Sequence, residues 1–216
     1  MKRLKAVLFD MDGVLLDSEE YINAAAVQMF TEKGFQVSPE DFIEFTGMGE
    51  NRYLGGVAEI HGIPFDLVQD KARTYEIYAD LVKGKLAPLP GAREFTARCK
   101  MLGLNIALAS SADRIKVEIN LKETGFHPEL FHTIVTGEDI ENKKPAPDIF
   151  LKAARGLSVH PAECLVVEDA IAGVEAGRAA GCRVLALTTS FPAEKLADAD
   201  WIIQDLSRAG PEILDW

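Results

Sequence analysis

The stretch Ala6–Ser18, which reads AVLFDMDGVLLDS, constrains the fold of this chain more than any other part of the sequence. Its first four residues, Ala6–Phe9, form an apolar run long enough for a β-strand buried on both faces. Asp10 and Asp12 follow directly, and Gly13 allows a sharp turn after them. Ligands of open parallel sheets collect at the carboxyl ends of the strands. We therefore expect both carboxylates to face a ligand site, although Asp and Gly are also common in surface turns.

Length and composition are those of an ordinary globular protein. The chain has 216 residues, 48% of them hydrophobic and 26% charged, which suits one large domain or a core with a smaller insert. The formal net charge of −11 argues against nucleic acid or an anionic membrane surface as the main partner. A small phosphorylated substrate is not excluded, because a bound divalent cation and a few bases can reverse the field locally.

Two further features concern the compartment. The basic start Met1–Lys5 lacks the longer apolar segment and the small-residue cleavage site of a signal peptide, and no run reaches the length of a membrane span. The three cysteines lie far apart in apolar surroundings, which predicts reduced thiols. We expect a cytoplasmic monomer without a membrane or nucleic-acid partner. Removal of a targeting peptide is compatible with these observations.

The sequence changes character between residues 17 and 87. Apolar residues at helical spacing mark one helix from about Ile22 to Phe30, which Gly34 can end. Ser38 and Pro39 look like a helix start, and a longer helical pattern follows Pro64. Glycines punctuate the stretch between them, over which no helix is predicted. No convincing strand occurs here, so we expect an all-helical insert.

After residue 87 strands and helices alternate. A stiff Pro- and Gly-containing connector, residues 86–91, leads into this part. Alternation of this kind predicts a parallel sheet covered by helices on both faces. We therefore expect an α/β core made of residues 1–16 and 88–216, with residues 17–87 inserted beside Asp10 and Asp12 as a cap. Beyond Ala6–Phe9, the predicted strands are 106–109, 133–135, 164–167, 183–187 and 201–203.

Polar side chains follow three of these strands at the points where the strands end. Because the carboxyl ends of parallel strands meet at one edge of a sheet, these groups are expected to gather near Asp10 and Asp12. They are Ser110 and Ser111, then Lys143 and Lys144, then Glu168 and Asp169.

These residue types suit phosphoryl transfer. Asp10 and Asp169 could share Mg²⁺, which typically takes one or two carboxylates plus phosphate and water. A carboxylate at that metal is a feasible nucleophile toward phosphorus, because the cation offsets repulsion from the phosphoryl oxygens. Lys144 and the Ser110 hydroxyl would hold the remaining oxygens. Asp12 could protonate the leaving oxygen and later deprotonate water.

Each of these residues also has a plainer interpretation when taken alone. Ser110 could cap a helix, and Lys144 could be a solvated surface lysine. Glu168 and Asp169 could cap the helix that follows them. The functional interpretation depends on all four strand ends carrying suitable groups together.

Four motifs in this order resemble the signatures of the haloacid dehalogenase superfamily. The inserted helical segment is similar to the cap of its β-phosphoglucomutase-like branch. The resemblance covers nearly the whole chain. The motifs are DMDGV at Asp10–Val14, ASS at Ala109–Ser111, KKPAPD at Lys143–Asp148 and VEDAIAGV at Val167–Val174.

The resemblance implies a role for each matching position. It makes Asp10 the nucleophile and Asp12 the general acid and base. It makes Ser110 and Lys144 the groups that clamp the phosphoryl oxygens. For Mg²⁺ it implies a site formed by the carboxylate of Asp10, the backbone carbonyl of Asp12, and Asp169 with Glu168 beside it.

Two positions of the insert depart from β-phosphoglucomutases. These enzymes carry a histidine four residues beyond the hydroxyl that matches Ser18, where this chain has Ile22. They carry an arginine three residues after the glycine that matches Gly47, where this chain has Glu50. Both positions help to hold the hexose phosphate, so the departures put mutase activity in doubt.

Substrate-binding candidates come from the same segments. We expect Ser111, Arg114, Gly47 and Arg52 to contact the substrate. Arg114 and Lys116 follow the second motif and could either reach a distal anion of the substrate or be solvated helix charges. The stretch FTGMGENRYLGGV, with ASSADRIK, also resembles the haloacid dehalogenase-like domain of a plant thylakoid photoprotection protein, which leaves open a role without a simple metabolite.

The sequence therefore predicts a Mg²⁺-dependent phosphohydrolase that acts on a small phosphorylated metabolite, such as a sugar phosphate, through an aspartyl-phosphate at Asp10. The nearest enzyme alternative is a β-phosphoglucomutase-type mutase. A dehalogenase is disfavoured, because Asp12 and Lys144 suit a phosphate and a metal. The alternative of another class is a non-catalytic phosphate-binding or regulatory domain.

Overall fold

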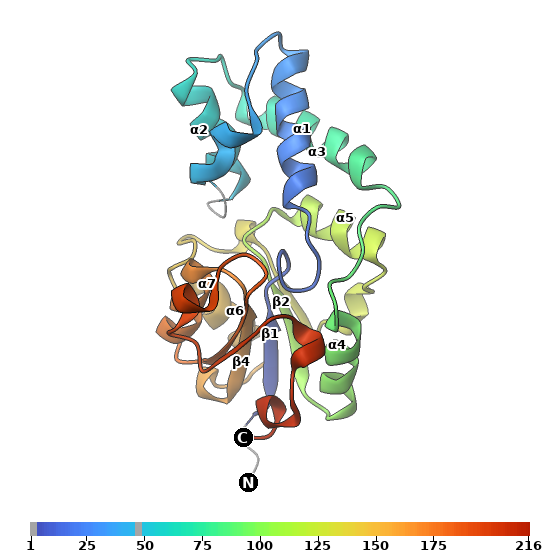
Figure 1. Cartoon of the computed structure of the whole chain (residues 1–216), viewed down its shortest axis with the longest axis vertical. Coiled ribbons are helices and arrows are strands. Elements are labelled where there is room, and N and C mark those ends of the chain that lie inside the picture. The colour runs from blue at the N-terminus through green and yellow to red at the C-terminus, as the bar shows by residue number, and fades with distance from the viewer. Residues whose placement is uncertain (1–3, 46–48) are drawn as a thin grey trace.

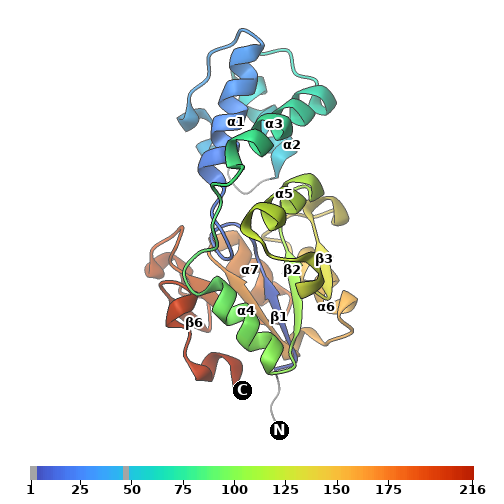
Figure 2. The same cartoon turned by 90° about the vertical axis from the view of Figure 1, so that its right-hand side faces the viewer.

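The core of the protein is a six-stranded parallel sheet in the order β3-β2-β1-β4-β5-β6. The computed structural model describes residues 4–45 and 49–216. Figures 1 and 2 show the sheet at one end of the molecule and a group of helices at the other, with the C-terminus at the sheet end. The strands are β1 (Ala6–Phe9), β2 (Asn105–Ala109), β3 (Thr133–Val135), β4 (Cys164–Glu168), β5 (Arg183–Leu187) and β6 (Trp201–Ile203).

Helices cover both faces of this sheet because its strands are apolar on both sides. Val7 and Phe9 contribute to a hydrophobic cluster under α4 (Ala92–Met101) and α5 (Arg114–Thr124). Ala6 and Leu8 point the other way, into a cluster with α6 (Asp148–Gly156) and α7 (Ile171–Ala179). The expected α/β core, a parallel sheet with helices on both faces, is confirmed.

The register of the central strands sets the position of the polar residues that follow them. Phe9 at the end of β1 lies opposite Leu108 on β2 and Val167 on β4. The next residues along each strand, among them Asp10 and Glu168, therefore lie side by side at the carboxyl edge.

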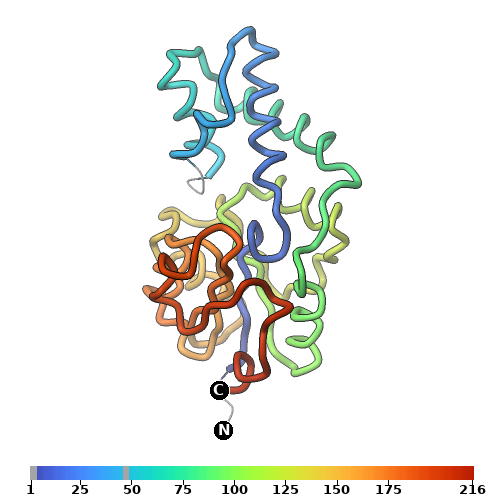
Figure 3. The backbone as a smooth tube through the Cα atoms, in the orientation of Figure 1, coloured from blue at the N-terminus to red at the C-terminus, as the bar shows by residue number. Residues whose placement is uncertain are grey.

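Among the described residues, three α-helices are inserted between β1 and α4 and pack around a hydrophobic cluster of their own. Two chain segments run between this helical unit and the core (Figure 3). They lie against each other, because Leu16 pairs with Pro88 and the Leu89 N–H donates to the Leu15 carbonyl at 2.9 Å. The exact boundaries at residues 16/17 and 87/88, and the role of the unit as a cap, stay predictions. The helices are α1 (Glu19–Glu32), α2 (Glu50–Ile60) and α3 (Leu67–Val82).

The helical unit differs from the sequence prediction in two places. Pro39–Phe45 forms a 3-10 helix, and the glycine-punctuated stretch contains helix α2, which was not predicted. Packing explains why a glycine stands at position 56 inside α2, because a Cβ there would lie 2.5 Å from the Phe45 ring. The glycine allows close packing inside a helix instead of ending it.

Within the part of the chain that the structure describes, no helix is both long and apolar enough to cross a membrane.

Candidate active site

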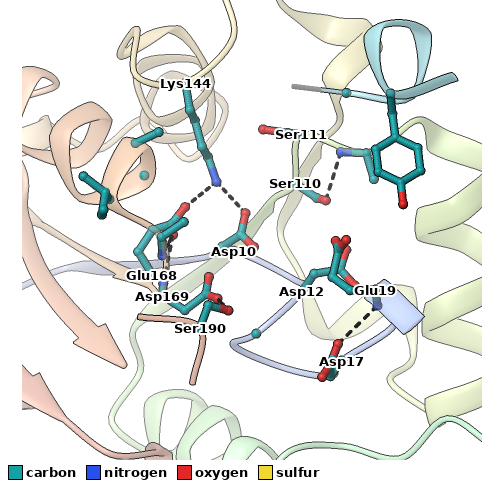
Figure 4. Close-up of a pocket in the computed structure, with 18 of the residues that line it drawn as sticks. Asp10, Asp12, Asp17, Glu19, Ser110, Ser111, Lys144, Glu168, Asp169 and Ser190 are labelled. Carbon is teal, nitrogen blue, oxygen red and sulfur yellow. Dashed lines mark hydrogen bonds and ion pairs between the residues drawn. The ribbon is translucent and has the colours of Figure 1, made fainter. Parts of the chain in front are cut away.

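A cavity of about 660 Å³ lies at the carboxyl edge of the sheet, under the helical unit. Core residues that lie at the ends of β1, β2, β4 and β5, or in the loops after β1 to β5, form one side of it, and residues of α1 and α2 contribute to the other. Figure 4 shows the polar side chains that converge there. Those predicted from the sequence are Asp10, Asp12, Ser110, Ser111, Lys144, Glu168 and Asp169.

Lys144 connects two carboxylates at the centre of the cavity. Its ammonium donates to Asp10 Oδ1 at 2.5 Å and also to Glu168 Oε1. Burial would lower the pKa of Lys144, but the two carboxylates raise it above its usual value, so the side chain stays charged. Burial raises the pKa of Asp10 to about 7 despite the opposing effect of Lys144. The alternative of a solvated surface lysine at position 144 is wrong, because only 8% of its side chain is exposed.

Glu168 organises the loop that carries Asp169. Its Oε2 accepts the backbone N–H groups of Asp169 at 2.9 Å and Ala170 at 3.0 Å. Both of its oxygens are therefore occupied within the protein. Glu168 thus fixes Lys144 and the loop, and leaves Asp169 as the carboxylate beside Asp10.

Asp169 is held against the turn that follows β1. Ser190 donates a hydrogen bond to its Oδ2. Gly13 has a φ of +74°, and a Cβ there would lie 1.9 Å from Asp169 Oδ2, so glycine is required by both conformation and space. Burial, and then the neighbouring charges of Glu168 and Asp10, raise the pKa of Asp169 well above its usual value.

Asp12 faces the helical unit from the other side of the cavity. Its Oδ1 accepts a hydrogen bond from Ser18, and its Oδ2 lies 3.1 Å from the ammonium of Lys116. Both carboxylate oxygens are thereby engaged with protein groups. Figure 4 shows Asp12 beside Glu19, on the side of the cavity away from Lys144.

The two serines after β2 differ in their surroundings. The hydroxyl oxygen of Ser110 accepts the Ala112 N–H at 3.2 Å, which leaves its proton available to a ligand. The hydroxyl of Ser111 is buried and has no hydrogen-bond partner among residues 4–45 and 49–216. Both residues line the cavity.

The substrate-binding residues expected from the helical unit and α5 are not all brought to the cavity. Gly47 lies outside the described residues. Arg52 pairs with Glu59 at 2.9 Å, and Arg114 pairs with Asp139 at 2.9 Å. Neither arginine is among the residues that line the cavity in the described part of the chain.

The structure corrects one of the two sequence interpretations of Lys116. A solvated helix charge was one of the two alternatives for it, yet only 3% of the residue is exposed. Burial lowers its pKa, but Asp12, Glu19 and Glu50 together raise it well above the usual value. The lysine therefore stays charged inside the cavity wall.

Residues 7–187 match the haloacid dehalogenase-like hydrolase family. The chain belongs to this family. Within it, the chain is 34% identical to the protein CbbY of Rhodobacter capsulatus over 98% of this chain and 97% of that protein. It is 31% identical to hexitol phosphatase A of Escherichia coli, over 95% of this chain and 93% of that enzyme. These matches support a phosphatase of the family.

Two further similarities complete the comparison. SUPPRESSOR OF QUENCHING 1 of Arabidopsis thaliana, a chloroplastic protein, is 48% identical over 91% of this chain, but the chain spans only 19% of the length of that protein. The crystal structure of Rhodobacter sphaeroides CbbY with xylulose-(1,5)bisphosphate superposes with a TM-score of 0.89 at 26% identity. This superposition covers 99% of this chain and 100% of CbbY.

Haloacid dehalogenase-like enzymes generally use Mg²⁺, and the donor set here fits such an ion in part. Among the described residues, no three His, Cys, Asp or Glu side chains converge as a complete metal site. The charge of Asp10 nevertheless raises the pKa of Asp169, so a cation beside the two carboxylates would be favoured electrostatically. Two carboxylates suffice for Mg²⁺, which usually fills its remaining positions with water and phosphate.

The contacts that several residues make in this haloacid dehalogenase-like site were not predicted from the sequence. Ser18 and Lys116 hold Asp12, and Ser190 holds Asp169. Thr189 donates to the Gly13 carbonyl at 2.6 Å. A signal for Thr189 and Ser190 was present, because they lie two and three residues after the end of the predicted strand 183–187.

Proposed function

We propose that this protein is a Mg²⁺-dependent phosphohydrolase that acts on small phosphorylated metabolites, such as sugar phosphates, through an aspartyl-phosphate at Asp10. The observation that carries the proposal is the contact between the Lys144 ammonium and Asp10 Oδ1 at the carboxyl edge of the sheet, inside a cavity shared with Asp12 and Ser110. The names of full-length relatives, among them hexitol phosphatase A, support it.

In the first step, a carboxylate oxygen of Asp10 attacks phosphorus and the ester P–O bond breaks. The Lys144 ammonium offsets the negative charge on the phosphoryl oxygens, and the Ser110 hydroxyl donates a hydrogen bond to one of them. Asp12, in its protonated form, gives its proton to the leaving alcohol oxygen. The products of this step are the free alcohol and a phosphorylated Asp10.

In the second step, water replaces the alcohol. Asp12, now a carboxylate, takes a proton from the water as the water attacks phosphorus. The P–O bond to Asp10 breaks, and inorganic phosphate leaves with both side chains restored. Asp10 and Asp169 would hold Mg²⁺, together with the backbone carbonyl of Asp12, and the ion would supply charge that screens the phosphate from the carboxylates.

Glu168 and Ser111 have supporting roles in this proposal. Glu168 orients Lys144 and the loop of Asp169 instead of binding the ion directly, because its oxygens are engaged. Ser111, with its buried hydroxyl, is available to a phosphoryl oxygen. The helical unit, residues 17–87, acts as a cap that covers the substrate.

Mutase activity is the runner-up and is disfavoured by the cavity wall. A mutase must keep the sugar bound and shield the aspartyl-phosphate from water while the sugar reorients. The residues at the two positions that serve this in β-phosphoglucomutases are Ile22 and Glu50, and both line this cavity. A purely regulatory domain would bind phosphate without turnover.

A phosphate-release assay with Mg²⁺ over a panel of phosphorylated metabolites tests the proposal. We expect slow release from several esters, and Asp10→Asn to reduce turnover at least about a hundredfold, because an amide cannot attack phosphorus. Circular dichroism checks that the variant is folded. Retained turnover in a variant free of deamidated protein would contradict the role of Asp10. Efficient conversion of β-glucose 1-phosphate to glucose 6-phosphate would favour the mutase.

A further inference from the structure

The end of the cavity away from Lys144 contains an unusual carboxylate. Glu50 is the first residue of α2 and lines the cavity, although only 7% of the residue is exposed. Its Oε2 is buried without a hydrogen-bond partner anywhere in residues 4–45 and 49–216. A buried carboxylate oxygen without a partner is costly to a folded protein. It is therefore a candidate for contact with a ligand.

The charges around Glu50 leave this end of the cavity negative. Lys116 faces three carboxylates, those of Asp12, Glu19 and Glu50. Asp113 is a fourth acid near Glu50, but it pairs with Lys71 at 2.6 Å. Burial raises the pKa of Glu50 and of Glu19, and the charge of Lys116 opposes this rise in both. With the three carboxylates ionised, one ammonium opposes them beside the cavity, and a second anionic group on a ligand would meet net repulsion.

Tyr53 and Ile22 are neutral groups that also line this end of the cavity. Asn23 donates to the Tyr53 hydroxyl oxygen at 3.0 Å, and burial raises the pKa of Tyr53 to about 12, so its O–H proton is retained and can be donated to a ligand. Ile22 adds an apolar surface. An acceptor, a donor and an apolar wall together match a chain or ring of carbons that carries hydroxyl groups.

We propose that Glu50 is a specificity-determining residue that selects monophosphate esters with a neutral, hydroxyl-bearing distal part and rejects esters with a second phosphate. Glu50 Oε2 accepts a hydrogen bond from a substrate hydroxyl, which satisfies its buried oxygen. A second phosphate, which at pH 8 has lost both of its protons, cannot donate such a bond and adds like charge. This inference rests on the proposed function, because it assigns the binding of the distal part of the substrate to the far end of the same cavity.

The test compares fructose 6-phosphate with fructose 1,6-bisphosphate, which differ only by the second phosphate. We expect the wild-type kcat/KM at pH 8 to favour the monophosphate by at least about tenfold, because the second phosphate of the bisphosphate would be brought close to carboxylates of like charge. Glu50→Gln keeps the shape and removes the charge, so the preference should fall to within about threefold. Because each ratio is taken within one variant, a general loss of activity cancels.

Glu59→Gln is the matched control, because Glu59 lies on the same helix α2 and its side chain is 73% exposed. It should keep the wild-type ratio. A wild-type preference within about threefold, or a preference that Glu50→Gln leaves unchanged, would overturn the role of Glu50.

Failure of the proposed function would look different from failure of this inference. Absence of turnover with every ester, p-nitrophenyl phosphate included, would contradict the proposed phosphatase activity. It would not contradict the proposed preference of the Glu50 end of the cavity for monophosphates. In that case the dissociation constants of the two fructose phosphates, measured by calorimetry with Mg²⁺, give the same ratios. Equal affinities in the wild type would then overturn the role of Glu50.

Discussion

Lys116 forms ion pairs that connect the two sides of the cavity. It lies on α5 of the core and contacts Asp12 at 3.1 Å and Glu19, the first residue of α1, at 4.0 Å. A single buried ammonium thus links the predicted acid–base residue to the helical unit. Removal of one partner from such a pair leaves the remaining charges buried and unbalanced.

We predict that Lys116→Met lowers the free energy of unfolding by about 3 kcal/mol, although methionine has a similar length and is apolar. Urea denaturation at pH 7 measures the change. Lys122→Met is the control, because Lys122 is exposed on the same helix and should change the stability by less than about 0.5 kcal/mol. Equal effects of the two substitutions would contradict a buried, charged Lys116.

At this scale, the sequence was informative for residues at strand ends and uninformative for those elsewhere. Asp10, Glu168 and Asp169 could be brought together because the register of parallel strands follows from the strands themselves. The burial of Lys116 could not be predicted, because its partners Asp12 and Glu19 come from other segments. Arg114 shows the converse, since it pairs with Asp139 and does not line the cavity in the described part of the chain.

Helix α2 shows how packing overrides composition at the scale of an element. Its adjacent glycines occupy different surroundings. A Cβ at Gly55 would have one neighbour, a Phe65 ring atom at 3.7 Å, which is an ordinary contact. A Cβ at Gly56 would overlap the Phe45 ring at 2.5 Å.

We predict opposite effects of alanine at these two positions. Gly55→Ala should raise the free energy of unfolding by about 0.5–1 kcal/mol, because alanine is the better helix former. Gly56→Ala should lower it by about 1–3 kcal/mol, because the added methyl group overpacks the contact with Phe45. Thermal and urea unfolding measure both. A stabilising Gly56→Ala would contradict the close approach of α2 to Phe45.

The elements of the core were predicted more fully than those of the helical unit. Strands β3, β5 and β6 have the expected bounds, because short apolar runs between turn residues leave little choice. Helix α2 was missed because a single sequence does not reveal whether a glycine ends a helix or packs against a ring. The 3-10 helix at Pro39–Phe45 has the expected start, but its type depends on packing against other parts of the unit.

At the scale of the whole molecule, the helical unit is joined to the core by two adjacent segments and contacts it mainly through α3 and α5. Lys71 on α3 pairs with Asp113, and the Gly84 N–H donates to Glu123 at 2.8 Å. The connectors meet at the Leu16–Pro88 pair. A few backbone rotations there would move the unit as a rigid body over the cavity.

We predict that Mg²⁺ with fluoroberyllate, a phosphate mimic at Asp10, closes the unit over the core, because the cation and ligand offset the repulsion among the acidic groups of both. Small-angle scattering should show a smaller radius of gyration, and limited proteolysis should show protection of residues 17–18 and 87–91. Asp10→Asn, which cannot form the adduct, is the control. Unchanged scattering and cleavage at saturation would indicate a fixed opening instead of a mobile cap.

The measurement that tests the central claim most directly uses Asp12→Asn with p-nitrophenyl phosphate and Mg²⁺. Nitrophenolate leaves without a proton, so Asp10 can still be phosphorylated, but without the Asp12 base the aspartyl-phosphate should hydrolyse slowly. We predict a burst of about one nitrophenolate per protein followed by slow turnover. Borohydride added after the burst should convert Asp10 alone to homoserine, as read by peptide mass spectrometry. Turnover without a burst, together with an unmodified Asp10, would contradict the aspartyl-phosphate at this residue.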